Sequence, residues 1–183
     1  KKIHVIYNSI DCSRFVPAEE AQRAALRQQF GLPADVVVFC FVGSGFERKG
    51  LASAIRAIAG TAAWLIVVGQ DKAENRYREL ARSLGCEGQI RFLGMQKETL
   101  PFYQLSDGLL LPTLYDPFPN VILEAMACGL PVITSESCGG AEFIEQGNNG
   151  FYCDALDINT LKEAVAAIPS LEKNNNMGLA ARE

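Results

Sequence analysis

The sequence has one histidine, His4, and none of its six cysteines form a C-x-x-C pair. Ser-His-Asp and Cys-His catalysis both require a histidine placed in a folded site. Zinc enzymes need several histidine or cysteine ligands that converge on one point. The near absence of histidine therefore excludes the first two mechanisms and argues against a zinc enzyme. Chemistry within this chain must use carboxylates, lysine, arginine and backbone amides.

A basic excess and a long apolar run are also missing. The formal net charge of −4 argues against a nucleic-acid-binding protein. No apolar run reaches the length that a bilayer requires, so no transmembrane segment is expected. The cysteines, several of them in apolar runs, are predicted to be buried free thiols of a reducing cytoplasm rather than disulfides or metal ligands. The start, Lys1 without a methionine or signal peptide, predicts a fragment of a longer protein.

Apolar, β-branched runs alternate with helical stretches about six times along the 183 residues. The predicted strands are residues 36–42, 63–68, 90–93, 109–111, 131–134 and 150–153. The predicted helices are residues 50–59, 72–84, 98–105, 120–128, 140–145 and 158–168. The pattern predicts an α/β fold, a doubly wound, Rossmann-like parallel sheet in a single domain. We expect its core at 17–170 and a polar C-terminal tail, open to fraying, at 171–183.

Ligands of such folds bind beyond the carboxyl ends of the strands, where loops 43–49, 93–97 and 113–120 are expected. The third loop contains Asp116-Pro-Phe-Pro-Asn-Val-Ile-Leu-Glu124. Pro119 suits the first position of a helix, whose free N–H groups attract anions. Amides for phosphates beside carboxylates for hydroxyls predict a site for a phosphorylated sugar. Asp116 and Glu124 could instead form a hydrolytic pair, or Glu124 could simply favour the helix dipole.

The first loop, Gly43 to Gly50, combines glycines with two adjacent cations, Arg48 and Lys49. The glycines allow a ligand close to the backbone, and the two cations could hold a diphosphate. The alternative is a tight turn with solvated basic residues. The loop departs from the dinucleotide fingerprint, because Arg48 stands where the third glycine belongs and Asp71 matches the expected acidic position only approximately.

The second loop gives a weaker signal. A planar base could rest at Leu93 with its edge on backbone groups, although a core strand followed by a surface loop explains the pattern equally well. Tyr103 in the following helix is predicted to pack in the core. Simple turn chemistry accounts for Cys138-Gly-Gly140.

Three segments together resemble the nucleotide-binding half of retaining GT-B glycosyltransferases. Val5-Ile-Tyr-Asn-Ser-Ile-Asp11 resembles the segment that crosses into the C-terminal domain, which suggests that residues 1–16 are an interdomain crossover. The Gly43 to Gly50 segment resembles the glycine loop with its basic diphosphate clamp. Asp116 to Glu124 resembles the family's Glu-x7-Glu element. The Gly43 to Gly50 segment and Val68-Gly-Gln-Asp-Lys72 also resemble segments of the lipopolysaccharide-core glucosyltransferases of this family.

The resemblance implies roles for particular residues. Arg48 and Lys49 would neutralise the leaving diphosphate, Asp116 would contact donor-sugar hydroxyls, and Glu124 would bind the ribose diol. The further residues expected to line the donor are Gly43, Ser44, Leu93, Pro117, Phe118, Pro119, Asn120 and Val121, with the N–H groups of the last two donating. Many relatives have arginine where this chain has Ser44, so that Arg48 must substitute. Asp116 replaces the usual glutamate and leaves the identity of the donor sugar open.

The sequence therefore predicts the donor-binding domain of a retaining hexosyltransferase. The donor would be UDP-glucose or a similar nucleotide sugar, with no metal or other cofactor. The acceptor, a glycan or a glycolipid such as lipopolysaccharide core, would bind through a missing N-terminal domain, so this domain alone is expected to be inactive. A cytoplasmic location is expected, with attachment to the inner face of the inner membrane open. The alternatives are the NAD-type domain of an oxidoreductase and a non-catalytic nucleotide-sugar-binding module.

Overall fold

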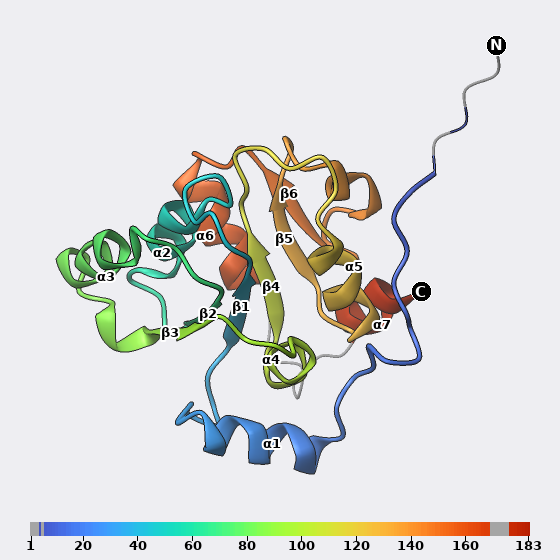
Figure 1. Ribbon diagram of the computed structural model, residues 1–183, viewed down its shortest axis with the longest axis horizontal. Coiled ribbons are helices and arrows are strands. Elements are labelled where there is room, and N and C mark those ends of the chain that lie inside the picture. The colour runs from blue at the N-terminus through green and yellow to red at the C-terminus, as the bar shows by residue number, and fades with distance from the viewer. Residues whose placement is uncertain (1–3, 5, 169–175) are drawn as a thin grey trace.

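The protein, seen here as a computed structural model, is described by residue 4 and by residues 6–168 and 176–183. A six-stranded parallel sheet with the strand order β3-β2-β1-β4-β5-β6 forms its centre (Figure 1). The strands are β1 (Val38–Val42), β2 (Trp64–Val68), β3 (Ile90–Gly94), β4 (Gly108–Leu111), β5 (Val132–Ser135) and β6 (Gly150–Cys153). All six predicted strands are present, and the predicted parallel α/β sheet is confirmed.

Helices form two groups around this sheet. The helices are α1 (Glu20–Gln29), α2 (Leu51–Ile58), α3 (Glu74–Ser83), α4 (Leu100–Leu105), α5 (Asn120–Ala127), α6 (Ile158–Ala167) and α7 (Asn176–Arg182), with short 3-10 helices η1 (Glu87–Gln89) and η2 (Gly139–Phe143). Helix α2 packs against α3 and α6, whereas α4 packs against α1 and α5, and α5 packs against α7. Strands covered in this way lack the alternation of exposed sheets, and β1, β4 and β5 are buried at every position.

The site is positioned by the reversal of strand order between β1 and β4. These two strands are neighbours, but the chain leaves β1 toward β2 and leaves β4 toward β5. The loops that follow them diverge to opposite sides, which in doubly wound folds leaves a ligand crevice at the carboxyl ends. The two loops nevertheless touch at their base, because the Thr113 hydroxyl donates to the Arg48 carbonyl at 2.8 Å.

Helix α1 has no counterpart among the predicted elements. Its sequence, EAQRAALRQQ, has few apolar residues, and the side chains that it buries are Arg23 and Arg27. A helix whose buried face is made of arginines produces no apolar period, which is the signal that predicts helices from sequence.

Three details differ from the sequence-based expectation. The segment predicted as a helix at 140–145 is the 3-10 helix η2. Pro119 is the residue that caps α5 rather than its first helical residue. Of the expected tail, residues 171–175 lie outside the described part. In the remainder, α7 packs on α5, and the Arg182 guanidinium donates to the Phe15 carbonyl at 3.1 Å. Within the described ranges, no helix is both long and apolar enough to span a membrane.

Candidate donor-binding site

One carboxylate and two cations meet at the carboxyl ends of β1 and β4. Asp116 Oδ2 accepts from Lys49 Nζ at 2.7 Å and from Arg48 Nη1 at 2.8 Å. The same guanidinium nitrogen donates to the Tyr115 carbonyl at 3.1 Å. The Lys49 and Asp116 side chains are 10% and 8% exposed, whereas that of Arg48 is 52% exposed. The structure therefore brings together the three residues predicted to be catalytic, with one side of the group open to solvent.

Opposing effects act on the Asp116 carboxyl. Burial raises its pKa, but the hydrogen bonds and positive charges of Lys49 and Arg48 outweigh burial, and the pKa lies below the ordinary value. The carboxylate is thus ionised at neutral pH. Two cations facing one such carboxylate leave the group with a net positive charge, which suits an additional anion.

Glycines at both ends of the first loop allow this meeting. Gly50 has a φ of 75°, and a Cβ atom there would lie 1.8 Å from the Pro112 carbonyl oxygen. Any side chain at this position would push the first loop away from the end of β4. A Cβ atom on Gly43, whose φ is 145°, would lie 3.3 Å from Cε of Lys49. The two glycines therefore give the backbone and the Lys49 side chain the space to approach Asp116.

The tip of the first loop is held by a carboxylate and an aromatic ring. Asp71 Oδ2 accepts from the Phe46 N–H at 2.8 Å, and Oδ1 accepts from the Ala73 N–H at 2.8 Å. The Phe46 ring is fully buried and packs edge-on against Phe41 and Tyr77. Sequence reasoning considered Asp71 only as a ribose ligand. In the structure both its oxygens serve the backbone, and the hydrogen bonds from Ala73 and Phe46 lower its pKa.

The turn before α5 presents backbone amides, as predicted. Helix α5 begins at Asn120 without a side-chain cap. Neither the Asn120 nor the Val121 N–H donates a hydrogen bond to any part of the chain that the structure describes. The Phe118 ring beside them packs against Phe143, and the Pro117 residue is exposed to solvent. These free donors at a helix N-terminus are oriented to bind an anion.

The loop after β5 supports the Asp116 backbone. The Gly139 N–H donates to the Asp116 carbonyl at 2.9 Å. A Cβ atom on Gly139 would lie 1.7 Å from the Pro117 carbonyl oxygen, so that only glycine fits against the turn. The glycines after Cys138 were ascribed to simple turn chemistry in the sequence. The close approach of Gly139 to the Pro117 carbonyl depends on the pairing of two loops distant in the sequence, for which the sequence contains no local signal.

Glu124 lies one turn into α5 and is partly exposed. Its Oε2 atom accepts from the Tyr103 hydroxyl at 2.7 Å and, more weakly, from Thr99 Oγ1 at 3.5 Å. Tyr103 is fully buried, as predicted, but packing is not its whole role. Its contact with Glu124 joins α4 to α5 and was missed by sequence reasoning, because no spacing in the sequence links the two.

Two further predicted residues lie near the carboxyl ends of β1 and β3. Ser44 is exposed, and its hydroxyl accepts from the Gln70 N–H at 3.4 Å. Leu93, the last residue but one of β3, is half-buried, and its carbonyl accepts from the Gln96 side chain at 2.7 Å. Among the described residues, no cluster of three or more histidine, cysteine, aspartate or glutamate side chains could hold a metal.

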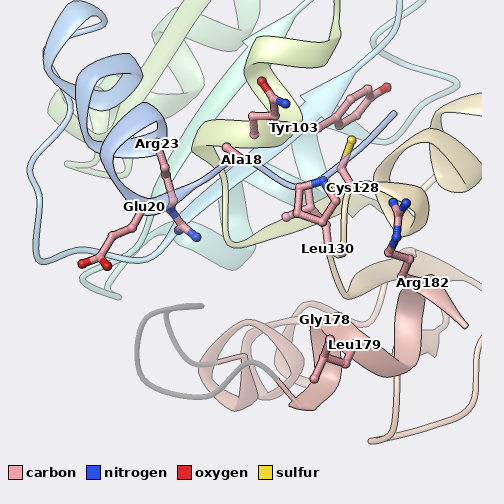
Figure 2. Close-up of a pocket in the computed structure, with 12 residues that line it drawn as sticks. Ala18, Glu20, Arg23, Tyr103, Cys128, Leu130, Gly178, Leu179 and Arg182 are labelled. Atoms are coloured by element: carbon pink, nitrogen blue, oxygen red, sulfur yellow. The ribbon is translucent and has the colours of Figure 1, made fainter. Parts of the chain in front are cut away.

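A cavity of about 310 Å³ lies at the other end of the sheet, between α1, α4, α5 and α7 (Figure 2). Leu130, Gly178 and Leu179 form part of its wall, with Arg23 and Arg182 at its sides. It faces the amino ends of the strands, and none of the residues predicted to bind a ligand lines it. We therefore place the functional site at the carboxyl ends, where the cations, the free amides and Glu124 are found.

Comparison with known proteins identifies the family of the chain. Residues 22–183 match the family described as "Glycosyl transferases group 1". The chain belongs to this glycosyltransferase family. Because the match spans nearly all of the domain, the resemblance to a GT-B C-terminal half, drawn from three short segments, is confirmed.

Several relatives are lipopolysaccharide enzymes. The chain is 33% identical over 171 residues to the lipopolysaccharide core biosynthesis glycosyltransferase LpsE of Rhizobium meliloti, covering 92% of the chain and 48% of LpsE. It is 34% identical over 134 residues to the lipopolysaccharide glucosyltransferase WaaG of Escherichia coli, covering 70% of the chain and 36% of WaaG. The chain spans about half the length, or less, of these curated relatives.

A solved structure supports the fold. Anabaena HepE in complex with UDP-glucose matches 98% of this chain and 51% of its own with a TM-score of 0.85, at 28% identity. The Rossmann-like, doubly wound architecture of this glycosyltransferase domain is thus shared with a nucleotide-sugar complex.

Proposed function

We propose that this glycosyltransferase domain binds a nucleoside diphosphate sugar, UDP-glucose or a close analogue, and supports its transfer with retention to a glycan or glycolipid. The main support is the meeting of Arg48, Lys49 and Asp116 beside the free amides of α5. HepE, a neighbour in fold, is described in complex with UDP-glucose, and LpsE and WaaG are described as lipopolysaccharide enzymes. The names of these relatives support a lipopolysaccharide core as the acceptor.

The chemistry requires stabilisation of a leaving group. When the anomeric C–O bond breaks, the electron pair stays on the diphosphate, whose negative charge grows. Lys49 and Arg48 on one side, and the Asn120 and Val121 N–H groups on the other, would stabilise that charge as it develops. Because these donors are fixed before the reaction, little reorganisation is needed when the bond breaks.

Asp116 would act at the donor sugar. Its Oδ2 atom holds both cations, and Oδ1 makes no hydrogen bond to the described residues. A sugar hydroxyl could donate to Oδ1, while the diphosphate shares the cations with Oδ2. Glu124 would accept from the ribose, and Leu93 would lie under the base. The acceptor, and any group that removes its proton, would come from another domain.

The NAD-type alternative is less well supported. A dinucleotide fold needs a free carboxylate after its second strand to bind the ribose hydroxyls. Asp71, the candidate, uses both carboxylate oxygens to hold the Phe46 and Ala73 N–H groups. Removing it from these donors to bind a ribose would release the tip of the first loop.

Calorimetry tests the proposal with UDP, UDP-glucose, ADP and NAD as titrants. We expect heat with a uridine nucleotide and none with NAD. The Glu124→Ala substitution should weaken UDP binding by roughly 1–3 kcal/mol, the cost typical of losing a hydrogen bond to a charged group. The Glu79→Ala substitution on exposed α3 is the control and should leave binding unchanged. Unchanged UDP affinity in Glu124→Ala would remove this residue from the site, and binding of NAD alone would favour the alternative.

A further inference from the structure

A buried tyrosine holds the carboxylate that the proposed function assigns to the ribose. Tyr103 is fully buried in α4, and its hydroxyl lies 2.7 Å from Oε2 of Glu124 in α5. Thr99, the residue that caps the N-terminus of α4, has its Oγ1 atom 3.5 Å from the same oxygen. Two hydroxyls, one in α4 and one at its N-cap, therefore approach one oxygen of Glu124, whose side chain is partly exposed.

The direction of the main hydrogen bond is fixed. Burial and then the neighbouring charge of Glu124 raise the pKa of Tyr103 well above its ordinary value. The phenol stays protonated at any physiological pH and donates to the carboxylate. A hydrogen bond with an ionised acceptor is stronger than one between neutral groups. Oε1 of Glu124 makes no hydrogen bond to the described residues and is left as the acceptor for a ligand.

The tyrosine ring has little freedom to move. It packs edge-on against Phe15, with ring centroids 6.1 Å apart. Part of its surface lines the cavity between α4 and α7, and its hydroxyl is directed away from Gly178 and Leu179 of that cavity (Figure 2). The ring thus fixes the hydroxyl from behind, and the hydroxyl in turn fixes one oxygen of Glu124.

We propose that Tyr103 is a positioning residue that holds Glu124 with Oε1 toward the ribose, and that the pair selects nucleotides whose ribose carries both hydroxyls. This inference rests on the proposed function. A free glutamate side chain would lose rotamer entropy when it binds a diol, whereas one already held by Tyr103 loses less. A sugar without these hydroxyls leaves the prepared acceptor without a donor, and such sites discriminate strongly.

The test is a two-by-two calorimetric comparison. UDP and 2′,3′-dideoxyuridine diphosphate are each titrated into the wild-type chain and into Tyr103→Phe. The phenylalanine keeps the ring against Phe15 and removes only the hydroxyl. We expect UDP affinity to fall about three- to tenfold, the range for one hydrogen bond, while affinity for the dideoxy nucleotide stays within about twofold. In a Glu124→Ala background the same substitution should have no further effect.

Tyr77→Phe is the matched control. Tyr77 is also buried, 3% exposed, and its ring packs against Phe46, but it lies on α3 and away from Glu124. Removing its hydroxyl should leave the preference for UDP over the dideoxy nucleotide unchanged. If Tyr103→Phe does not fold, Glu124→Asp, which withdraws the carboxylate from Tyr103 by one methylene, gives the same comparison and should likewise reduce the preference.

The outcomes separate this inference from the proposed function. Equal losses for both nucleotides would show that Tyr103 acts only on the fold, and an unchanged UDP affinity would show that its hydroxyl does not act at all. Either result overturns the inference and leaves the proposed function standing. A wild-type chain that binds no nucleotide overturns both.

Discussion

Two clusters of charged side chains, each with one carboxylate and two cations, lie at opposite ends of β4. Asp107, directly before the strand, pairs with Arg23 and Arg27 of α1. Asp116, just beyond the strand, pairs with Arg48 and Lys49. These are called the Asp107 group and the Asp116 group. Only β4 and a short turn separate the two aspartates along the chain.

The two groups differ in what surrounds them. The Asp107 side chain is fully buried and that of Arg27 is 4% exposed, whereas that of Arg48 is 52% exposed. Asp107 also accepts from the Val38 N–H at 2.7 Å, and Arg27 donates to the Leu105 carbonyl at 2.9 Å. The Asp107 group therefore joins α1, α4 and β1 inside the protein, while the Asp116 group has a side left for a ligand. The two groups differ in exposure rather than in charge.

The largest expected effect concerns the buried Asp107 group. Asp107→Ala leaves two buried guanidinium groups without their carboxylate, and breaking a buried pair in this way typically costs about 3–5 kcal/mol. We expect a loss of this size in the free energy of unfolding, measured by urea denaturation. The matched substitution Asp116→Ala should cost only about 1–2 kcal/mol, between a buried and an exposed pair, because Arg48 can turn to solvent. Equal losses would break the comparison.

The second prediction concerns the Asp116 group. Lys49→Ala removes a nearly buried cation from the proposed diphosphate site. In the full-length enzyme we expect turnover to fall by more than about tenfold, because the growing charge on the leaving group loses a fixed partner. The free energy of unfolding of the domain should change much less than in Asp107→Ala. Steady-state kinetics and urea denaturation on the same variant check both statements.

Arg82→Ala provides the control for Lys49. Its side chain is 66% exposed at the end of α3, where it pairs with Glu87. It removes the same unit of positive charge far from the crevice, so turnover should be close to that of the wild type. Near-normal turnover in Lys49→Ala, or an equal loss in Arg82→Ala, would contradict the assignment of the diphosphate to the first loop.

Much of the fold could be predicted because burial on both faces leaves a simple trace in the sequence. The run Val38 to Val42 is apolar at every position, which is the pattern of a parallel strand covered by helices on both faces. All six strands were located from such runs. Helix α1 was missed because its buried contacts are made by Arg23 and Arg27, which resemble surface residues in a sequence. The strand order cannot be read from the sequence, and the expectation that the loops after β1 and β4 share one ligand came from their residues and from the family resemblance.

The site was predictable where one short segment contained the signal. The spacing of Asp116 and Glu124 around Pro119, and the adjacent Arg48 and Lys49, are local patterns, and the structure brings them to one end of the sheet. The contact of Tyr103 with Glu124 joins α4 to α5 through two residues that are 21 positions apart in the sequence. Such pairs depend on how α4 and α5 pack, which no periodicity in either helix specifies. Their roles in binding stay predictions.

The smallest expected effect concerns acid. Because Lys49 and Arg48 hold the pKa of Asp116 below its ordinary value of 3.8, its ionised form stabilises the folded state. That contribution is complete above pH 3.8 and is lost as the pH falls through the lower pKa of the folded protein. The difference in free energy of unfolding between wild type and Asp116→Asn, measured by urea denaturation, should therefore be constant near neutrality and shrink below this value. A difference that stays constant at every pH would mean that the two cations do not stabilise the Asp116 carboxylate, and the Asp116 group would then contribute no favourable electrostatic interaction to the fold.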